Sequence, residues 1–182
     1  MTIDLEKQER TITSTPLAAG TYLVGDPCYA FDNDLDHNWQ NWLEDAWKDT
    51  DPNKVRILDG RVDGMRVVAA GTEYGDGAYG GSDGNEYGVD AGLLGAVHID
   101  FLRNLYPEYS SMSRDEVEAA SMMFVVEFPE PFHVSYEDGT ISIGHIDIYT
   151  GDMSVDEEDL CPNCGGDDCY EDCLEADDEE QE

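Results

Sequence analysis

The sequence predicts an α+β domain built mainly on antiparallel β-sheet, arranged as a sandwich or a partly open barrel. Short apolar stretches bounded by turn residues recur along the chain, and some alternate with polar residues, as at Phe132, Val134 and Tyr136. Strand and helix patterns do not alternate regularly, which disfavours a parallel sheet. One Trp-rich amphipathic helix and one short second helix complete the expected fold. The expected parts are an N-terminal segment (1–17), a β-rich α+β domain (18–151) and an acidic, mostly disordered tail with a four-cysteine motif (152–182).

The first firm strand is expected at 20–25, because this apolar run stops at Asp26-Pro27, where proline cannot donate to a sheet. The polar residues before it are expected to fray or to form an edge segment. Residues 34–48 then show helical spacing of apolar residues, with Asp34 as a plausible N-cap. All three tryptophans fall in this helix, and a tryptophan stripe of this spacing is typical of packing against a sheet.

Further elements follow in order. We expect strands at 55–58 and 61–70 around an Asp59-Gly60 turn, an apolar strand at 93–99 and a helical turn at 99–106. Ser113 and Glu116 form a capping-box pattern that opens a short helix. The closing strands are expected at 122–128, 132–136, 141–143 and 146–148, with a hairpin turn at Asp138-Gly139.

The glycine-rich stretch 74–88 has two interpretations. Asp83-Gly84 is a strong hairpin signal, so the stretch can be a β-hairpin with these residues at its tip. Alternatively, Asp76 and the backbone amides around it form a concave polar site, since glycine lets the backbone approach a ligand closely. The glycine spacing matches neither a phosphate-binding P-loop nor a dinucleotide fingerprint.

The charge is extreme, with 43 Asp and Glu against 9 Lys and Arg and a net charge of −34. The tail alone does not explain it, because residues 1–150 contain 28 acidic and 9 basic residues. The negative charges of such a domain repel one another in dilute salt, and molar salt screens that repulsion. Scarce lysine and abundant Asp therefore predict adaptation to high salt. The alternative is an acidic DNA mimic or viral antagonist that occupies a host protein, which requires acids arrayed along one face.

Composition also excludes some functions and locations. Direct nucleic-acid binding is not expected, because phosphate contacts need Lys and Arg. No apolar run approaches the ~20 residues that span a bilayer, and the N-terminus lacks the apolar core of a secretory signal. We therefore expect a cytoplasmic protein without a membrane partner, acting on an unknown small ligand or protein.

The tail carries four of the five cysteines, and their spacing is C-x2-C-x4-C-x3-C. A C-x2-C pair near a second pair favours metal over disulfides in a reducing compartment. The Cys-Pro-Asn-Cys-Gly turn resembles the knuckles of zinc-ribbon and rubredoxin-type sites, and the overall spacing is closest to a compact zinc knuckle. The segment has neither the histidine nor the basic surroundings of such knuckles, so their nucleic-acid role does not carry over. We expect one structural Zn²⁺, and the alternative is reduced cysteines or a redox pair. The expected ligands are Cys161, Cys164, Cys169 and Cys173.

Three short motifs give a family resemblance. They are GDPCY at 25–29, GDG-Y at 75–79 and VD-G at 89–92. With them the chain resembles a group of small proteins of bacteria, archaea and their viruses, over about residues 18–150. The resemblance implies a single β-rich domain and nothing more, and it does not cover the cysteine tail. We also expect an archaeal or viral source.

The favoured function is a non-enzymatic binding or regulatory module. Asp, Gly and Tyr are concentrated in loops, where binding residues usually lie. We expect the three motifs to meet at one end of the sheet and to hold a small ligand or a cation; the alternative is that these residues serve turns alone. The candidate ligand-binding residues are Asp26, Cys28, Tyr29, Asp76, Gly77, Tyr79 and Asp90.

An enzyme is the less favoured hypothesis, and no residue is assigned a catalytic role. Cys28 as nucleophile, His98 as base and Asp90 as the group orienting that base form a chemically allowed trio for a hydrolase. Asp26, Asp76 and Asp90 could also hold Mg²⁺ or Ca²⁺. Cys28 is otherwise expected to be a small buried apolar residue.

Overall fold

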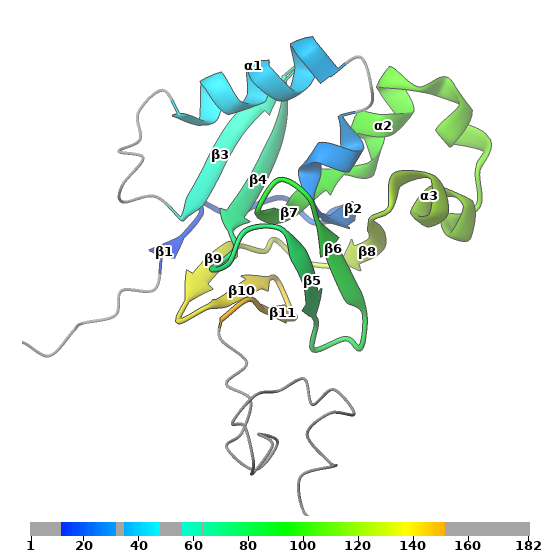
Figure 1. Ribbon diagram of the computed structural model, residues 1–182. Coiled ribbons are helices and arrows are strands. Elements are labelled where there is room, and N and C mark those ends of the chain that lie inside the picture. The colour runs from blue at the N-terminus through cyan, green and yellow to red at the C-terminus, as the bar shows by residue number, and fades with distance from the viewer. Residues whose placement is uncertain (1–11, 32–34, 48–55, 63, 152–182) are drawn as a thin grey trace, which may run out of the picture. The chain divides into compact units, whose positions relative to one another are not determined.

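The computed structural model describes residues 12–31, 35–47, 56–62 and 64–151 (Figure 1). The chain divides into two units, Met1–Gly151 and Asp152–Glu182, and the second lies outside the described residues. The first unit confirms the predicted α+β class. Its described part contains three α-helices and antiparallel sheets that do not close into a barrel.

The described strands are more numerous than the sequence indicated, and several have different bounds. They are β1 (Ile12–Thr13), β2 (Gly20–Gly25), β3 (Ile57–Val62), β4 (Met65–Gly71), β5 (Gly77–Gly80), β6 (Glu86–Val89), β7 (Leu93–His98), β8 (Phe124–Phe128), β9 (Val134–Glu137), β10 (Thr140–Ile143) and β11 (Ile146–Tyr149). The α-helices are α1 (Leu35–Trp47), α2 (Ile99–Leu105) and α3 (Arg114–Ser121), and the 3-10 turns are η1 (Pro27–Ala30) and η2 (Pro107–Ser111). The expected helical turn after residue 99 is thus a complete short helix.

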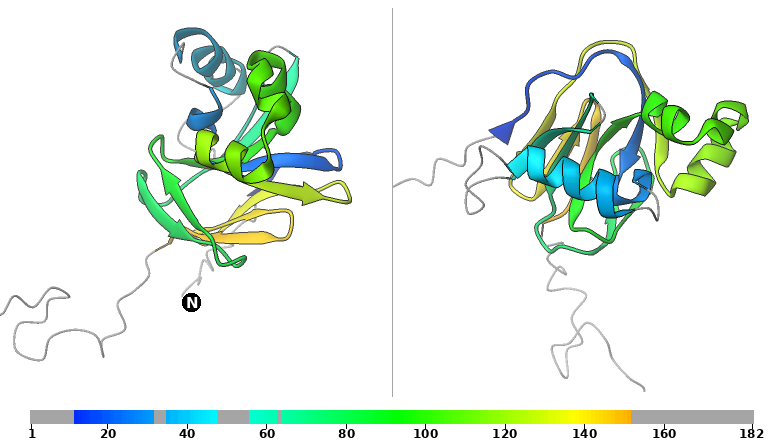
Figure 2. Two further views of the ribbon diagram at one scale, coloured as in Figure 1. Left: turned by 90° about the vertical axis from the view of Figure 1, so that its right-hand side faces the viewer. Right: turned by 90° about the horizontal axis from the view of Figure 1, so that it is seen from above.

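A five-stranded antiparallel sheet lies at the centre, with strand order β3-β4-β7-β2-β8. The helices cover one of its faces, and the remaining strands cover the other (Figure 2). Its middle strands are buried on both faces, and β2, β4 and β7 are accordingly almost entirely apolar.

The second layer combines a four-stranded sheet, β1-β9-β10-β11, with the β5–β6 hairpin. The hairpin joins β11 through a bridge between Gly81 and Ile148, where the Ser82 N–H donates to the Asp147 carbonyl over 2.8 Å. Figure 1 shows the hairpin beside β10 and β11. Alternate residues of these strands face the central sheet, so the layers form a sandwich around one apolar core.

The helical face corrects one prediction. The expected Asp59-Gly60 turn is wrong, because both residues lie inside β3, and the connection to β4 comes after Val62. Helix α1 crosses β3 at Gly60, where an added Cβ would lie 2.8 Å from the Trp42 carbonyl oxygen. Gly60 therefore allows a close helix approach instead of a turn. Trp42 is fully buried there and donates its indole N–H to the Val67 carbonyl over 3.1 Å.

Candidate functional site

The carboxylate of Asp26 joins two of the predicted motifs. Asp26 follows the last residue of β2, is fully buried and caps η1. One carboxylate oxygen accepts from the Cys28 N–H at 3.0 Å, and the other accepts from the N–H groups of Asp90 and Ala91 at 2.8 and 2.6 Å. A buried charge is costly unless it is hydrogen-bonded, and here three backbone donors satisfy it. Asp26 thus fixes the turn 26–30 against the loop that follows β6.

Cys28 lies beside this carboxylate and is half-buried. Burial raises the pKa of its thiol well above the usual range, and the charges of Asp26, Asp90 and Asp76 raise it further. The same interactions place all three carboxylates within electrostatic reach of the sulfur. At neutral pH the thiol is therefore protonated, whereas a cysteine nucleophile must be a thiolate.

His98 does not reach Cys28, so the proposed Cys28–His98–Asp90 trio is wrong. Strands β2 and β7 pair with Tyr22 opposite His98 and Gly25 opposite Gly95. His98 consequently lies at the start of β2, roughly 10 Å of strand away from Gly25, whereas Cys28 follows the end of β2. Its Nδ1 instead accepts the Asp100 N–H at 3.2 Å as the cap of α2.

Tyr29 turns its hydroxyl to Asp90. Burial raises the pKa of this phenol, and the hydrogen bond to Asp90 and the charge of that carboxylate raise it further. An added Cβ at exposed Gly88 would lie 3.9 Å from the Tyr29 hydroxyl oxygen, so the ring reaches β6 as well. Tyr29 and the exposed Asp90 therefore form one wall of the site, next to a strand edge that carries no side chain at Gly88.

The loop between β4 and β5 brings Asp76 to the same end of the sandwich. The Thr72 hydroxyl lies 2.7 Å from the Gly75 carbonyl and 3.2 Å from the Gly92 carbonyl, and the Tyr79 hydroxyl donates to Gly75 at 2.9 Å. Tyr79 thus supports the loop backbone and does not point its hydroxyl at a ligand. Asp76 itself is exposed.

Gly77 is the first residue of β5 and pairs with Val89, which confirms the hairpin interpretation of the glycine-rich stretch. Asp83 and Gly84 lie at the tip, with Gly84 at φ +83°. Asp83 accepts hydrogen bonds from the Tyr87 hydroxyl at 2.7 Å and from Asn85. Burial alone would raise the pKa of Asp83, but these hydrogen bonds outweigh it and hold the pKa below its usual value.

The site does not have the donor set of a metal centre. Within residues 12–31, 35–47, 56–62 and 64–151, no group of three or more His, Cys, Asp and Glu side chains is placed to hold a metal ion. Asp26 already accepts three N–H groups, which corrects the expectation that Asp26, Asp76 and Asp90 share an ion. The expected zinc ligands Cys161, Cys164, Cys169 and Cys173 lie outside the described residues.

The structure brings together five of the seven candidate side chains: Asp26, Cys28, Tyr29, Asp76 and Asp90. Sequence reasoning missed Ala91 and Thr72, which contribute through a backbone N–H and through a hydroxyl directed at backbone carbonyls. No side-chain pattern signals such contacts. The position of Ala91 and Gly92 within the VD-G motif was the one available hint.

Comparisons with protein-family models, curated proteins and solved structures found no match. None of the helices in the described ranges is long and apolar enough to cross a membrane.

Proposed function

We propose that the protein is a non-enzymatic binding protein whose site is the loop end formed by Cys28, Tyr29, Asp76 and Asp90. The observation that carries this proposal is the buried Asp26 carboxylate, which ties the turn of Cys28 and Tyr29 to the loop of Asp90. Thr72 links the loop of Asp76 to the same place through the Gly92 carbonyl. A site whose loops are fixed before binding loses less conformational entropy when the ligand arrives. Loop ends held by a rigid scaffold are also where binding residues concentrate.

The chemistry favours binding over catalysis. The Cys28 thiol and the Tyr29 phenol are both held in their neutral forms by burial and nearby carboxylates. Neither is poised as a nucleophile or base near neutral pH, where catalytic groups need pKa values close to the working pH. Of the histidine side chains that the structure describes, His98 caps α2, and His133 and His145 line a pocket at the other end of β2, so none of these three activates the thiol.

The outward-facing groups favour a ligand that donates hydrogen bonds and carries positive charge. Asp76 and Asp90 are exposed carboxylates, and neither forms an ion pair with a described Lys or Arg. Together they supply carboxylate acceptors beside a neutral phenol. A small organic cation such as a primary amine fits this set better than a bare metal ion, which needs more converging ligands.

The test is a thermal-shift screen of small amines and their neutral analogues against wild type and a variant carrying Asp76→Asn and Asp90→Asn. We expect one or more amines to raise the melting temperature of wild type and not of the variant. The matched control carries Glu127→Gln and Glu137→Gln, which remove the same charge from exposed positions on β8 and β9. An unchanged screen in a folded double variant contradicts the proposal.

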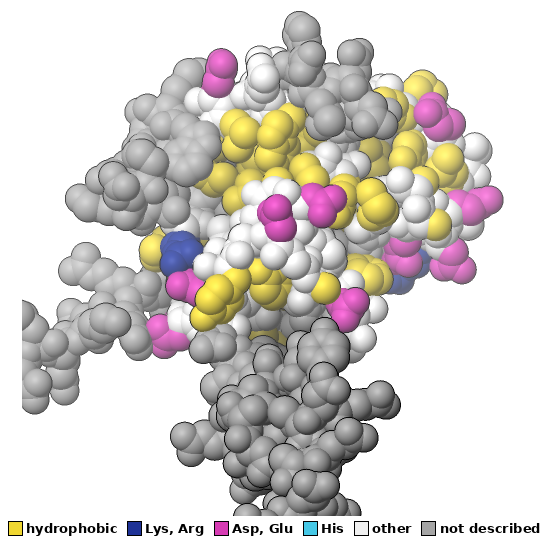
Figure 3. All heavy atoms as spheres, viewed as in Figure 1, with side chains coloured by type: hydrophobic (Ala, Val, Ile, Leu, Met, Phe, Trp, Pro, Cys, Tyr) yellow, Lys and Arg dark blue, Asp and Glu magenta, His cyan; other side chains and the backbone are white. Residues whose placement is uncertain are grey.

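High-salt adaptation is the second part of the proposal. Five of the nine Lys and Arg residues lie in the described ranges, against a far larger number of carboxylates. On the face shown in Figure 3 the acidic side chains are spread in small groups instead of forming one row, which favours salt adaptation over mimicry of a phosphate backbone. We expect the free energy of unfolding to rise steadily as KCl approaches molar concentration. Full stability in dilute buffer, with salt-sensitive retention on a DNA-binding protein, favours the DNA-mimic or viral-antagonist alternative.

Structural zinc in the tail is the third part, and it rests on the cysteine spacing alone. Four thiolates at this spacing can complete a tetrahedral site. Elemental analysis of full-length protein should find about one zinc per chain, and replacing all four tail cysteines by serine should abolish it. Zinc that is absent from wild type, or equal in both proteins, contradicts this part.

A further inference from the structure

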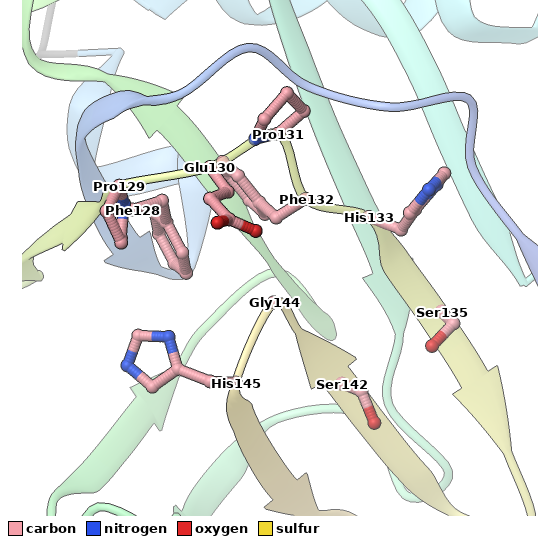
Figure 4. Close-up of a pocket in the computed structure, with 10 residues that line it drawn as sticks. All are labelled: Phe128, Pro129, Glu130, Pro131, Phe132, His133, Ser135, Ser142, Gly144 and His145. Atoms are coloured by element: carbon pink, nitrogen blue, oxygen red, sulfur yellow. The ribbon is translucent and has the colours of Figure 1, made fainter.

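A pocket of about 410 Å³ lies at the other end of β2 from Asp26 (Figure 4). The segment that leaves β8 forms one wall, and the β10–β11 turn forms the opposite wall. Its volume falls in the range typical of small-ligand sites. The lining residues are Phe128, Pro129, Glu130, Pro131, Phe132, His133, Ser135, Ser142, Gly144 and His145.

The floor of the pocket is rigid. The Phe128 and Phe132 rings stack with their centroids 3.8 Å apart, and the His145 ring lies 5.4 Å from Phe128. Gly144 adopts φ +61°, and an added Cβ there would lie 2.5 Å from the Phe128 ring. Glycine is therefore required for the turn to close against the aromatic stack. The Gly144 turn and the aromatic stack therefore pack directly against each other.

The polar groups of the pocket mainly accept hydrogen bonds. The Glu130 side chain extends toward the Gly144–His145 turn (Figure 4), is exposed and forms no ion pair with a described Lys or Arg. His133 Nδ1 lies 2.8 Å from the Ser14 carbonyl oxygen, which can only accept, so Nδ1 donates to it and this ring nitrogen is not free for a ligand. The Ser142 hydroxyl donates to Asp147 over 2.6 Å, which leaves its oxygen lone pairs as acceptors.

We propose that this pocket binds a guanidinium or amidinium group carried on a short apolar body, with Glu130 accepting its N–H groups. A planar N–H fork matches a carboxylate in two parallel hydrogen bonds. The exposed rings of Pro129, Pro131 and His145, which line the pocket, suit the flat apolar part of such a ligand. The site is independent of the loop site at Asp26, because the two lie at opposite ends of β2.

The same chemistry can come from a free small molecule or from an arginine side chain of a partner protein. Benzamidine is the probe for the first source, and benzamide, its neutral isostere, is the control. A capped Gly-Arg-Gly peptide is the probe for the second source, with the citrulline peptide as its control. Tighter binding of benzamidine assigns the pocket to a small ligand, and tighter binding of the arginine peptide assigns it to a protein partner.

The experiment is an NMR titration of the full chain, observed at the imidazole protons of its four histidines. We expect His133 and His145 to shift on addition of a cationic probe, while His98, at the junction of β7 and α2, does not. The neutral controls should leave all of them unchanged. Glu130→Gln should weaken binding roughly threefold to tenfold, whereas Glu127→Gln, a neighbouring exposed glutamate on β8, should not.

Several results would overturn the proposal. One is that neither benzamidine nor the arginine peptide shifts the His133 and His145 signals at concentrations up to about 10 mM, since weaker binding is not meaningful. Another is equal binding of the charged and neutral probes. A third is that His98 shifts as much as His133 and His145. A fourth is that Glu130→Gln and Glu127→Gln weaken binding of the probe equally. Either result indicates general attraction of cations to an acidic surface.

Discussion

The two ends of β2 are closed by different forces. At Gly25 the chain continues into Asp26, whose buried carboxylate accepts hydrogen bonds from three N–H groups in two loops. At Gly20, which pairs with Phe128, aromatic rings close the sandwich: Tyr22 packs edge-on against Phe132 with ring centroids 4.9 Å apart, and Phe132 stacks on Phe128. The Gly25 end is held by a few hydrogen bonds to one carboxylate. The Gly20 end is held by contact between aromatic rings.

The two ends should therefore respond differently to substitution. Loss of the Asp26 carboxylate removes the acceptor of three part-buried N–H groups at once, so the polar end should fail as a unit. An aromatic stack loses contact area in proportion to the atoms removed and can relax in part. The polar end also leaves Asp76 and Asp90 facing outward on fixed loops, whereas the aromatic end leaves a pocket.

The largest effect is expected from Asp26→Ala. It removes the acceptor of the Cys28, Asp90 and Ala91 N–H groups and should lower the free energy of unfolding by about 4 kcal/mol. Urea denaturation at one fixed salt concentration measures it. Asp76→Ala is the control, because this exposed carboxylate should change stability by less than about 0.5 kcal/mol. Equal effects of the two substitutions would show that Asp26 does not hold the loops.

A somewhat smaller effect is expected at the aromatic end. Phe132→Ala should cost about 3 kcal/mol through lost contacts and the cavity it leaves beside Phe128 and Tyr22. Native-state hydrogen exchange should then rise around β8 and β9 while the amides of Asp90 and Ala91 keep their protection. If those two amides lose protection as well, the two ends are not independent.

The smallest effect concerns alkaline pH. The Cys28 thiol has a raised pKa in the folded protein, because burial and then the charge of Asp26 disfavour the thiolate, so it binds its proton more tightly than in the unfolded chain. Its contribution to stability is complete below the unfolded value of about 8.5 and is lost progressively as pH rises above it.

We therefore expect wild type to lose roughly 0.5–1 kcal/mol more than Cys28→Ser between pH 8 and pH 9.5, after allowance for partial exposure. Urea denaturation of both proteins at each pH measures this difference. The tail cysteines are present in both proteins and cancel. A parallel pH dependence of the two proteins would contradict a raised Cys28 pKa, and so would rapid reaction of native Cys28 with iodoacetamide at pH 8.

Local signals in the sequence were enough for much of the fold. Pro27 correctly ends β2, Asp83-Gly84 forms the hairpin tip, and Ser113 with Glu116 forms the capping box of α3. Each of these depends on residues close together in the chain. Gly60 was misjudged because its reason is distant: Asp-Gly usually marks a turn, but here the glycine makes room for α1.

The candidate site was only partly predictable, because some of it also depends on residues that are distant in the sequence. The three motifs do meet, and Asp26, Cys28 and Asp90 lie together as expected. The pairing of β2 with β7 could not be read from residue types, and it is this register that places His98 at the wrong end for Cys28. The pocket between the segment that follows β8 and the β10–β11 turn was missed. It forms where the chain passes from the five-stranded sheet to the four-stranded sheet, and no sequence motif marks this crossing.

Amide hydrogen exchange of the native protein tests the central claim most directly. If the Asp26 carboxylate holds the loop end together, the N–H groups of Cys28, Asp90 and Ala91 should exchange slowly in wild type, although they lie in a turn and a loop. In Asp26→Asn, which keeps the shape and loses the charge, they should exchange much faster while β7 and β8 stay protected. Fast exchange of these amides in wild type, or unchanged protection in the variant, would contradict the account.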